Sequence, residues 1–539
     1  MPASVYPRPA MVSWAFARVA PRFLAVSLEG ATLTIVPCLL LSLLYWGRPE
    51  LLLTSDSLTP TDFIWDLLHH GDAWAGFEQP HSPGFFPDET VVGIVQAVTG
   101  SWRVAMAAWV LVVLLWLVTA GSAIAAHIAQ CTHRTATLAV LALVLPLMTT
   151  AALYSSDMHP GTNAQGIFFS WILTLLPGGH GGNFLLALTA ALVASRAAKH
   201  VRVRDIACLT FLSFAGEVSD QLSLISLLAP VTAALLGGLL AGTIRKENAI
   251  RLLTCVWFGA ALGGFCASKM DRQYMPHPSF DSFLEHAGRF LAELGDHLDV
   301  IAAMLVLTIA LAVLAWRDGL RLWPGGFWPV FAAVSSFGSL AFTAIFYEDV
   351  WSFRYALPLL WWAVIFAATL LVKAGPWWFW ASRGWVAAMA AGLAMVWVSA
   401  GAQVPRLLTW STPLASCLRE AGLQAGLADF WIARQTSIAS DWSLQIGALN
   451  AFGAARIWGN DRLWFTHDIH DGTRRPPYRF IVTDRLPVER LSAAYGEPDR
   501  VMMCGNSTVW VFNDSAKLFR DLGRASPFLS ELFAAAPPE

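Results

Sequence analysis

Charge is scarce in this chain of 539 residues, of which only 13% are Asp, Glu, Lys or Arg, whereas 56% are hydrophobic. A soluble protein of this length usually carries about twice that charged fraction. The formal net charge of −2 also lacks the basic excess that is typical of nucleic-acid-binding domains. The composition therefore indicates a polytopic membrane protein, and nucleic acid is not an expected partner.

Common nucleotide and metal motifs are missing as well. The sequence contains no P-loop and no glycine-rich dinucleotide fingerprint, so it gives no support for an ATP-driven pump. It has no CxxC pair and no Cys/His spacing typical of zinc. Of its seven cysteines, only Cys417 and Cys504 lie in the polar C-terminal part. They could pair in an oxidising compartment, or they could be two unrelated buried thiols.

Long uncharged runs are what the chain has in place of charge. A membrane-spanning helix needs roughly 20 apolar residues, and about eleven runs approach or exceed that length. These runs lie near residues 23–46, 104–128, 135–153, 176–195, 205–220, 221–243, 252–268, 299–316, 327–346, 355–373 and 385–403. The first is too long for a signal-peptide core and is interpreted as an uncleaved anchor. Lys and Arg gather in alternate loops, which places those loops and the N-terminus in the cytoplasm.

A composition change near residue 403 divides the chain in two. Residues 1–403 form the predicted transmembrane domain, and 404–539 read as a small soluble α/β domain. Within the latter, residues 417–437 are predicted as a helix, and 478–484 as a strand. Residues 501–504 and 507–512 are predicted as two strands joined by a Gly-Asn hairpin turn. An odd number of spans places this domain outside the cytoplasm.

The first outer loop, residues 47–101, is too long for a plain connector. A short helix is predicted over residues 60–71, then a proline-rich turn, then an apolar segment that lies flat or enters the bilayer. Asp56 follows the first span, and Asp88 precedes the apolar segment, so the two could converge at the outer membrane boundary. One carboxylate could accept a proton, or the pair could hold a divalent cation.

Helix capping is the alternative for these acids. Ser57 or Thr61 could cap the short helix, and Asp62 would suit its N-terminal dipole. Asp88 could cap the apolar segment that follows in the same way.

The chain has an anchor span, a structured outer loop with an aspartate just past that span, many further spans and an outer domain. This arrangement resembles the GT-C superfamily of membrane glycosyltransferases. The chain is similar to uncharacterised bacterial members with an SD…FFPD loop, and EDVWSFRYALP (348–358) resembles the Arg-Tyr-x-x-Pro element of such enzymes. The resemblance implies that Asp56 is the catalytic acid/base and Asp88 the second acid. The chain lacks the plain Asp-Glu dyad of other branches, which leaves a Mg²⁺ or Mn²⁺ cofactor open.

Other polar residues beside the apolar runs are candidate substrate-binding groups. The glycine-rich break PGGHGGN contributes His180 and Asn183, which line a cavity or sit at a simple loop tip. Asp220 could face a polar donor site or pair with Arg354, and Arg354 could grip a lipid phosphate or snorkel to the interface. The full set of candidates is His81, His159, His180, Asn183, Asp220, Lys269, Arg272, Arg354 and Tyr355.

The resemblance implies a transferase at the outer face of the bacterial cytoplasmic membrane. Its partners would be a polyprenyl-phosphate sugar donor, membrane lipids, and a glycan, lipid or protein acceptor. Asp56 would deprotonate the acceptor, and the lipid phosphate would leave. Two other functions stay open: a transporter or flippase for a lipid-linked glycan, and a non-catalytic membrane partner in polysaccharide assembly.

Overall fold

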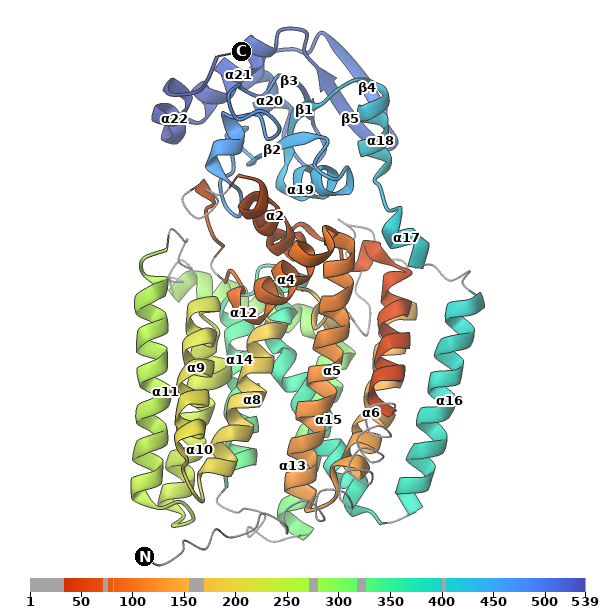
Figure 1. Ribbon diagram of the computed structural model, residues 1–539, viewed down its shortest axis with the longest axis vertical. Coiled ribbons are helices and arrows are strands. Elements are labelled where there is room, and N and C mark those ends of the chain that lie inside the picture. The colour runs from red at the N-terminus through yellow and green to blue at the C-terminus, as the bar shows by residue number, and fades with distance from the viewer. Residues whose placement is uncertain are drawn as a thin grey trace, which may run out of the picture.

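The computed structural model describes residues 33–70, 76–80, 82–154, 169–270, 280–317, 326–375, 377–399 and 404–538. A bundle of long helices carries a smaller domain of strands and helices at one end (Figure 1). The main helices of the bundle are Leu33–Trp46, α5 (Trp102–Ala129), α6 (His133–Tyr154), α8 (Gly181–Ala197), α9 (Val203–Ser219), α10 (Ala229–Leu240), α11 (Lys246–Ala267), α13 (Leu298–Arg317), α14 (Phe327–Ile345), α15 (Leu357–Lys373) and α16 (Trp377–Ser399).

Six of the described helices are long and apolar enough to cross a membrane, namely α5, α6, α11, α14, α15 with the preceding turn, and α16. A seventh is added if α12 (Phe280–Leu294) and α13, which meet at 89°, count as one span. Apolar side chains also face outward on peripheral helices, as Phe258, Phe265 and Trp380 do. In water such surfaces would be unfavourable, so these features are consistent with a membrane protein.

Each of the predicted spans overlaps a described helix, which bears out the helical reading of the apolar runs. Five predicted spans lie outside the six helices named above. The span predicted at 299–316 falls on α13 of the bent pair, and the other four fall on shorter helices, among them Leu33–Trp46 and α8. The topology of about eleven crossings and its orientation therefore stay predictions.

The segment predicted as the first outer loop, residues 47–101, contains α2 (Ser55–His69), η2 (Phe85–Glu89) and α4 (Thr90–Thr99). Helix α2 begins before the predicted residue 60 because Thr54 and Ser57 form a capping box at its start. Neither Ser57 nor Thr61 is the N-cap residue, which is Thr54. Asp56 thus occupies the first turn of α2. Pro60 lies inside the helix, where it has no N–H to donate to the Asp56 carbonyl.

The C-terminal domain is built on a five-stranded sheet of order β2-β1-β3-β5-β4. Its strands are β1 (Ala425–Asp429), β2 (Gln445–Leu449), β3 (Tyr478–Val482), β4 (Arg500–Cys504) and β5 (Ser507–Val511). Strand β1 pairs in parallel with β2 and β3, whereas β5 is antiparallel to β3 and β4. The predicted α/β domain, the strand at 478–484 and the hairpin at Gly505 are confirmed.

The single helix predicted over 417–437 is wrong. The segment forms α18 (Pro413–Glu420), then β1, then α19 (Phe430–Ala439). Gly422, at φ +69°, follows the end of α18, and the next residues form a short buried strand. A five-residue buried strand of small and apolar residues has no periodicity that separates it from a helix. Cys417 and Cys504 form a disulfide between α18 and β4.

The C-terminal domain rests on α2 through α19. Arg434 of α19 donates from Nε to Asp62 of α2 at 3.0 Å, and its other nitrogens reach Ser55 O and Thr59. Trp442 Nε1 donates to the second oxygen of Asp62 at 2.9 Å. Helix α2 therefore belongs to both parts of the molecule, and it fixes Asp56 relative to both.

Candidate functional site

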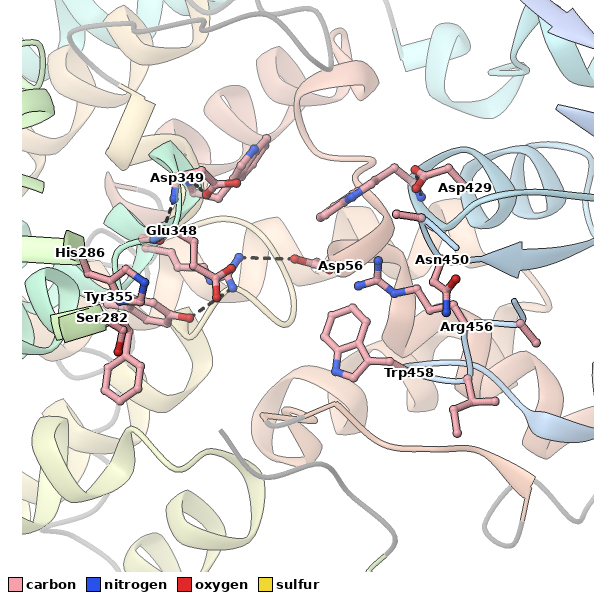
Figure 2. Close-up of a pocket in the computed structure, with 18 of the residues that line it drawn as sticks. Asp56, Ser282, His286, Glu348, Asp349, Tyr355, Asp429, Asn450, Arg456 and Trp458 are labelled. Atoms are coloured by element: carbon pink, nitrogen blue, oxygen red, sulfur yellow. Dashed lines mark hydrogen bonds and ion pairs between the residues drawn. The ribbon is translucent and has the colours of Figure 1, made fainter. Parts of the chain in front are cut away.

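A cavity of about 900 Å³ opens where the helix bundle meets the C-terminal domain. Pockets for small molecules typically measure about 300–1,000 Å³, so this one is large enough for a sugar phosphate. Figure 2 shows Asp56 between two groups of side chains. On the bundle side are Ser282, His286, Glu348, Asp349 and Tyr355, and on the C-terminal-domain side are Asp429, Asn450, Arg456 and Trp458.

Asp56 is a partly exposed carboxylate in the cavity wall. Its Oδ2 lies 3.4 Å from Arg354 Nη1, and its side chain is 25% exposed. Its Oδ1 is shielded from water and has no hydrogen-bond partner in the part of the chain that the structure describes. A buried acceptor without a donor is costly, so a carboxylate oxygen in this state needs a specific explanation, such as a catalytic role.

Arg354 comes from η5 (Val350–Ala356), the turn that precedes α15. The Asp349 side chain caps this turn by accepting from Trp351 N at 2.9 Å. Arg354 Nη2 donates to Tyr355 OH at 3.3 Å, while its Nε has no partner among the described residues. Burial raises the pKa of Asp349 although Arg354 opposes the shift. The Arg354 side chain is 26% exposed and lines the cavity.

The opposite wall lies at the carboxyl ends of the parallel strands β1 and β2. Asp429 ends β1 and Asn450 follows β2 directly. In open sheets with parallel strands, ligands bind outside these strand ends. Burial raises the pKa of Asp429 and lowers that of Arg456. The Arg456 guanidinium lies 5.1 Å from the ring centre of Trp458, so cation and aromatic groups stand together here.

Two smaller hollows adjoin this cavity on the bundle side, of about 60 and 20 Å³. Arg354 and Tyr355 line all three spaces, and His180 lines both small ones. Asn183, buried, lines the smallest and donates to Ser226 Oγ at 2.9 Å. Asp220 is buried behind His180 and binds its Nδ1 at 2.6 Å. Of the five predicted substrate-binding residues in this region, His180, Arg354 and Tyr355 thus line a hollow together with Asp56, while Asn183 and Asp220 adjoin them.

Asp88 lines neither the cavity nor the two adjoining hollows. It is 2% exposed, and its Oδ1 accepts from Gly178 N at 2.8 Å. Its Oδ2 packs so closely on Gly182 that a Cβ there would lie 1.8 Å away. Burial raises the pKa of Asp88 to about 7. Asp88 therefore holds the glycine-rich segment that carries His180, an arrangement that differs from the expected convergence of both acids on one open site.

The other predicted site residues are placed elsewhere or lie outside the described residues. Lys269 is exposed at the end of α11, with its Nζ 5.4 Å from the Phe265 ring. His81, His159 and Arg272 fall outside the described residues. Within the described ranges, no three His, Cys, Asp or Glu side chains form a group that could hold a metal ion.

Several residues that line the cavity were not predicted as site residues from the sequence. Asp349 stands in the EDVWSFRYALP element beside Arg354, where its charge was a visible signal. Asp429 could have been found only from the strand that it ends, which was taken for helix. Arg456 and Trp458 follow β2 in a segment without regular structure, so only the docking of the C-terminal domain shows their role.

These residues can do three things together. Asp56 can accept a proton, and Arg354 can bind two oxygens of a phosphate. The aromatic and polar groups of the wall on the C-terminal-domain side can hold a hydroxylated ligand. The chain matches no protein-family model, no curated protein and no solved structure.

Proposed function

We propose that the protein is a membrane glycosyltransferase that takes a sugar from a polyprenyl-phosphate donor. An acceptor hydroxyl on a glycan, lipid or protein attacks the anomeric carbon, and Asp56 takes the hydroxyl proton. The bond between the anomeric carbon and the phosphate oxygen breaks, and its electron pair leaves with the lipid phosphate. Arg354 binds that phosphate and balances its negative charge.

The observation that carries this proposal is the Asp56–Arg354 pair at the cavity wall. A base and a phosphate-binding cation stand 3.4 Å apart at their nearest atoms, and both side chains line the large cavity and the adjoining hollow of about 60 Å³. A sugar phosphate bound in these spaces would contact both side chains. Its transferred carbon would then lie beside the base, which is the proximity that group transfer needs.

The position of the cavity suits a donor with a lipid tail. Arg354 belongs to the turn before α15, and the smallest hollow continues from it to Leu222, Ile225 and Leu357 of the bundle. The phosphate would sit beside Arg354, and the isoprenoid chain would run along the apolar surface of the bundle, since a hollow of about 20 Å³ is too small to hold it. The acceptor would reach the opposite wall, which the C-terminal domain supplies.

The outer face of the bacterial cytoplasmic membrane is the proposed location. The Cys417–Cys504 disulfide supports it, because disulfides persist mainly in oxidising compartments. The alternate distribution of Lys and Arg among the loops supports the same orientation.

Sugar transfer by the full chain in proteoliposomes tests the proposal. Labelled polyprenyl-phosphate hexoses and pentoses serve as donors, and an envelope extract supplies acceptors. Asp56→Asn keeps the shape of the side chain but cannot take a proton, so we expect transfer to fall to background. The matched control is Asp296→Asn, an exposed aspartate between α12 and α13. Transfer by Asp56→Asn at the wild-type rate would contradict the mechanism.

Transport of a lipid-linked glycan is the second candidate, and the 89° break between α12 and α13 favours it. Broken helices are frequent in transporters, where they sit near the membrane midplane. Here α12 contributes Ser282 and His286 to the cavity that also holds Asp56. A vesicle assay separates the two functions, because a flippase moves the intact lipid-linked glycan between leaflets and leaves its glycosidic bond uncut.

A further inference from the structure

His180 and Asp220 form a buried pair next to the proposed catalytic base. The His180 Nδ1 lies 2.6 Å from Asp220 Oδ2, and the two side chains are only 8% and 4% exposed. The other oxygen of Asp220 accepts from Ser82 Oγ at 2.7 Å and from Leu222 N at 2.9 Å. Asp220 is therefore held on both oxygens, and it in turn fixes the orientation of the imidazole.

The backbone of His180 is in an uncommon conformation. Its φ is +66°, in the left-handed region that few residues other than glycine adopt. It stands at the N-cap position of α8, yet its side chain makes no capping hydrogen bond. The side chain is turned to Asp220 instead. Strained positions of this kind gather at functional sites, which directs attention to the ring nitrogen that remains.

That nitrogen, Nε2, has no partner among the described residues, and the imidazole lines both small hollows. The His180 ring lies 5.0 Å from the Tyr355 ring, and Tyr355 OH accepts from Arg354. The Arg354 side chain lines both small hollows as well. Three groups that can bind an oxyanion therefore surround the same small space.

We propose that His180, Arg354 and Tyr355 form a subsite for a phosphate monoester, with Asp220 as the positioning residue behind the imidazole. The inference deepens the proposed function and rests on it, because the lipid phosphate that leaves the sugar is such a monoester. A phosphate monoester carries a charge of about −1.5 to −2 at pH 7 and offers several acceptor oxygens. Because Nδ1 is bound to Asp220, Nε2 is the ring nitrogen left to face a phosphate oxygen.

Charged and polar groups surround His180 on several sides. Besides Asp220, the charged or titratable groups near His180 are Tyr355 against its ring, Asp56 and Arg354 across the larger of the two hollows, and Asp88 beside Asp220. Arg354 offsets the negative charge of Asp56 at this point.

Binding by the full chain in nanodiscs tests the subsite with three probes: undecaprenyl phosphate, undecaprenol and inorganic phosphate. For His180→Asn we expect the Kd of undecaprenyl phosphate to rise about tenfold or more, in line with hydrogen bonds to charged groups. The Kd of undecaprenol should not change. Asp220→Asn should raise the Kd of undecaprenyl phosphate less than His180→Asn does, and it should leave the Kd of undecaprenol unchanged. His200→Asn, an exposed histidine at the other end of α8, is the control.

The three probes distinguish the possible results. Inorganic phosphate that binds and competes would identify the headgroup alone as sufficient, whereas binding of the lipid phosphate only would show that the tail is needed. Wild-type affinity of His180→Asn for undecaprenyl phosphate, or an equal loss for undecaprenol, would overturn the subsite.

A measurement on the unaltered protein keeps the proposal testable if the variants do not fold. Diethylpyrocarbonate modifies free imidazole nitrogens, and peptide mass analysis reports modification of His180. We expect undecaprenyl phosphate, but not undecaprenol, to protect it, and equal modification in both cases would refute the proposal. If Asp56→Asn abolishes sugar transfer while His180 fails these tests, the transferase stands and the subsite falls. Protection of His180 in a protein that transfers no sugar would support the phosphate subsite and contradict the transferase.

Discussion

Arg434 of α19 and Asp62 of α2 form a buried ion pair at 3.0 Å, with side chains only 1% and 3% exposed. Burial raises the pKa of Asp62 and lowers that of Arg434, so each charge depends on the other. The pair joins the C-terminal domain to the first outer loop, and it lies two turns along α2 from Asp56. The geometry of the cavity therefore depends on an interaction outside it.

Replacement of Arg434 should release the C-terminal domain. Arg434→Met leaves Asp62 buried without its cation, and loss of one partner of a buried pair costs about 3–5 kcal/mol. We expect a lower thermal midpoint in detergent and faster release of the domain by limited proteolysis. Arg524→Met is the control, since Arg524 is 78% exposed in its ion pair with Asp521 and such pairs contribute about 0–1 kcal/mol. An unchanged midpoint for Arg434→Met would show that the domain is held by other contacts.

Asp88 should make the folded state less stable as the pH rises. Its folded-state pKa of about 7 is above the ordinary value for an aspartate because the carboxyl is buried. Between about pH 4 and pH 7 the folded state keeps a proton that the unfolded state has lost, so stability falls through this window and stays lower above it. Asp88→Asn cannot lose that proton and should flatten the profile.

Thermal midpoints from pH 4 to pH 8 measure this effect. Glu531→Gln, which removes an exposed carboxyl on α22 (Ser530–Ala534), serves as the control and should keep the wild-type profile. The same profile in Asp88→Asn as in the wild type would mean that Asp88 is ionised at low pH in the folded protein.

Local sequence patterns identified part of the candidate site. They could not identify the residues that reach the cavity only because the C-terminal domain docks on α2. Asp56 could be located because it follows an apolar run directly, and Arg354 because it lies in a short motif before another run. Asp88 has the same kind of position, but Gly178 N and the bare Cα of Gly182 draw its carboxylate into the protein. No periodicity in the first loop indicates such a contact about 90 residues away.

The cavity wall that the C-terminal domain supplies could not be predicted from local sequence patterns. Arg456 and Trp458 come about 400 residues after Asp56, and they approach it only because Arg434 and Trp442 bind Asp62. A buried ion pair between distant segments leaves no trace in composition or hydropathy. The α/β character of the domain was predictable, since its strands and hairpin turn have strong local signals.

The disulfide offers a test of which side of the membrane carries the C-terminal domain. Cys417 and Cys504 are bonded, and they are the cysteines of this domain. In intact cells, we expect a membrane-impermeant maleimide to label them only after an impermeant reductant is added. The Cys417→Ser/Cys504→Ser variant is the control for labelling of the five other cysteines. Labelling that requires lysed cells would place the domain in the cytoplasm.

Trp458 should hold the sugar between the two walls of the cavity. It lines both the large cavity and the hollow of about 60 Å³, so its indole stands where the space narrows toward Asp56 and Arg354. An aromatic face can cover the apolar face of a sugar ring, and aromatic contacts add about 0.5–1.5 kcal/mol beyond buried area. Trp458→Ala should therefore raise the KM for the sugar donor about tenfold, whereas Trp458→Phe should recover most of the loss. Trp380→Ala, on the exposed surface of α16, is the control. Equal kinetics for Trp458→Ala and the wild type would remove Trp458 from the sugar site, while a fall in kcat alone would assign it to the geometry of Asp56 rather than to binding.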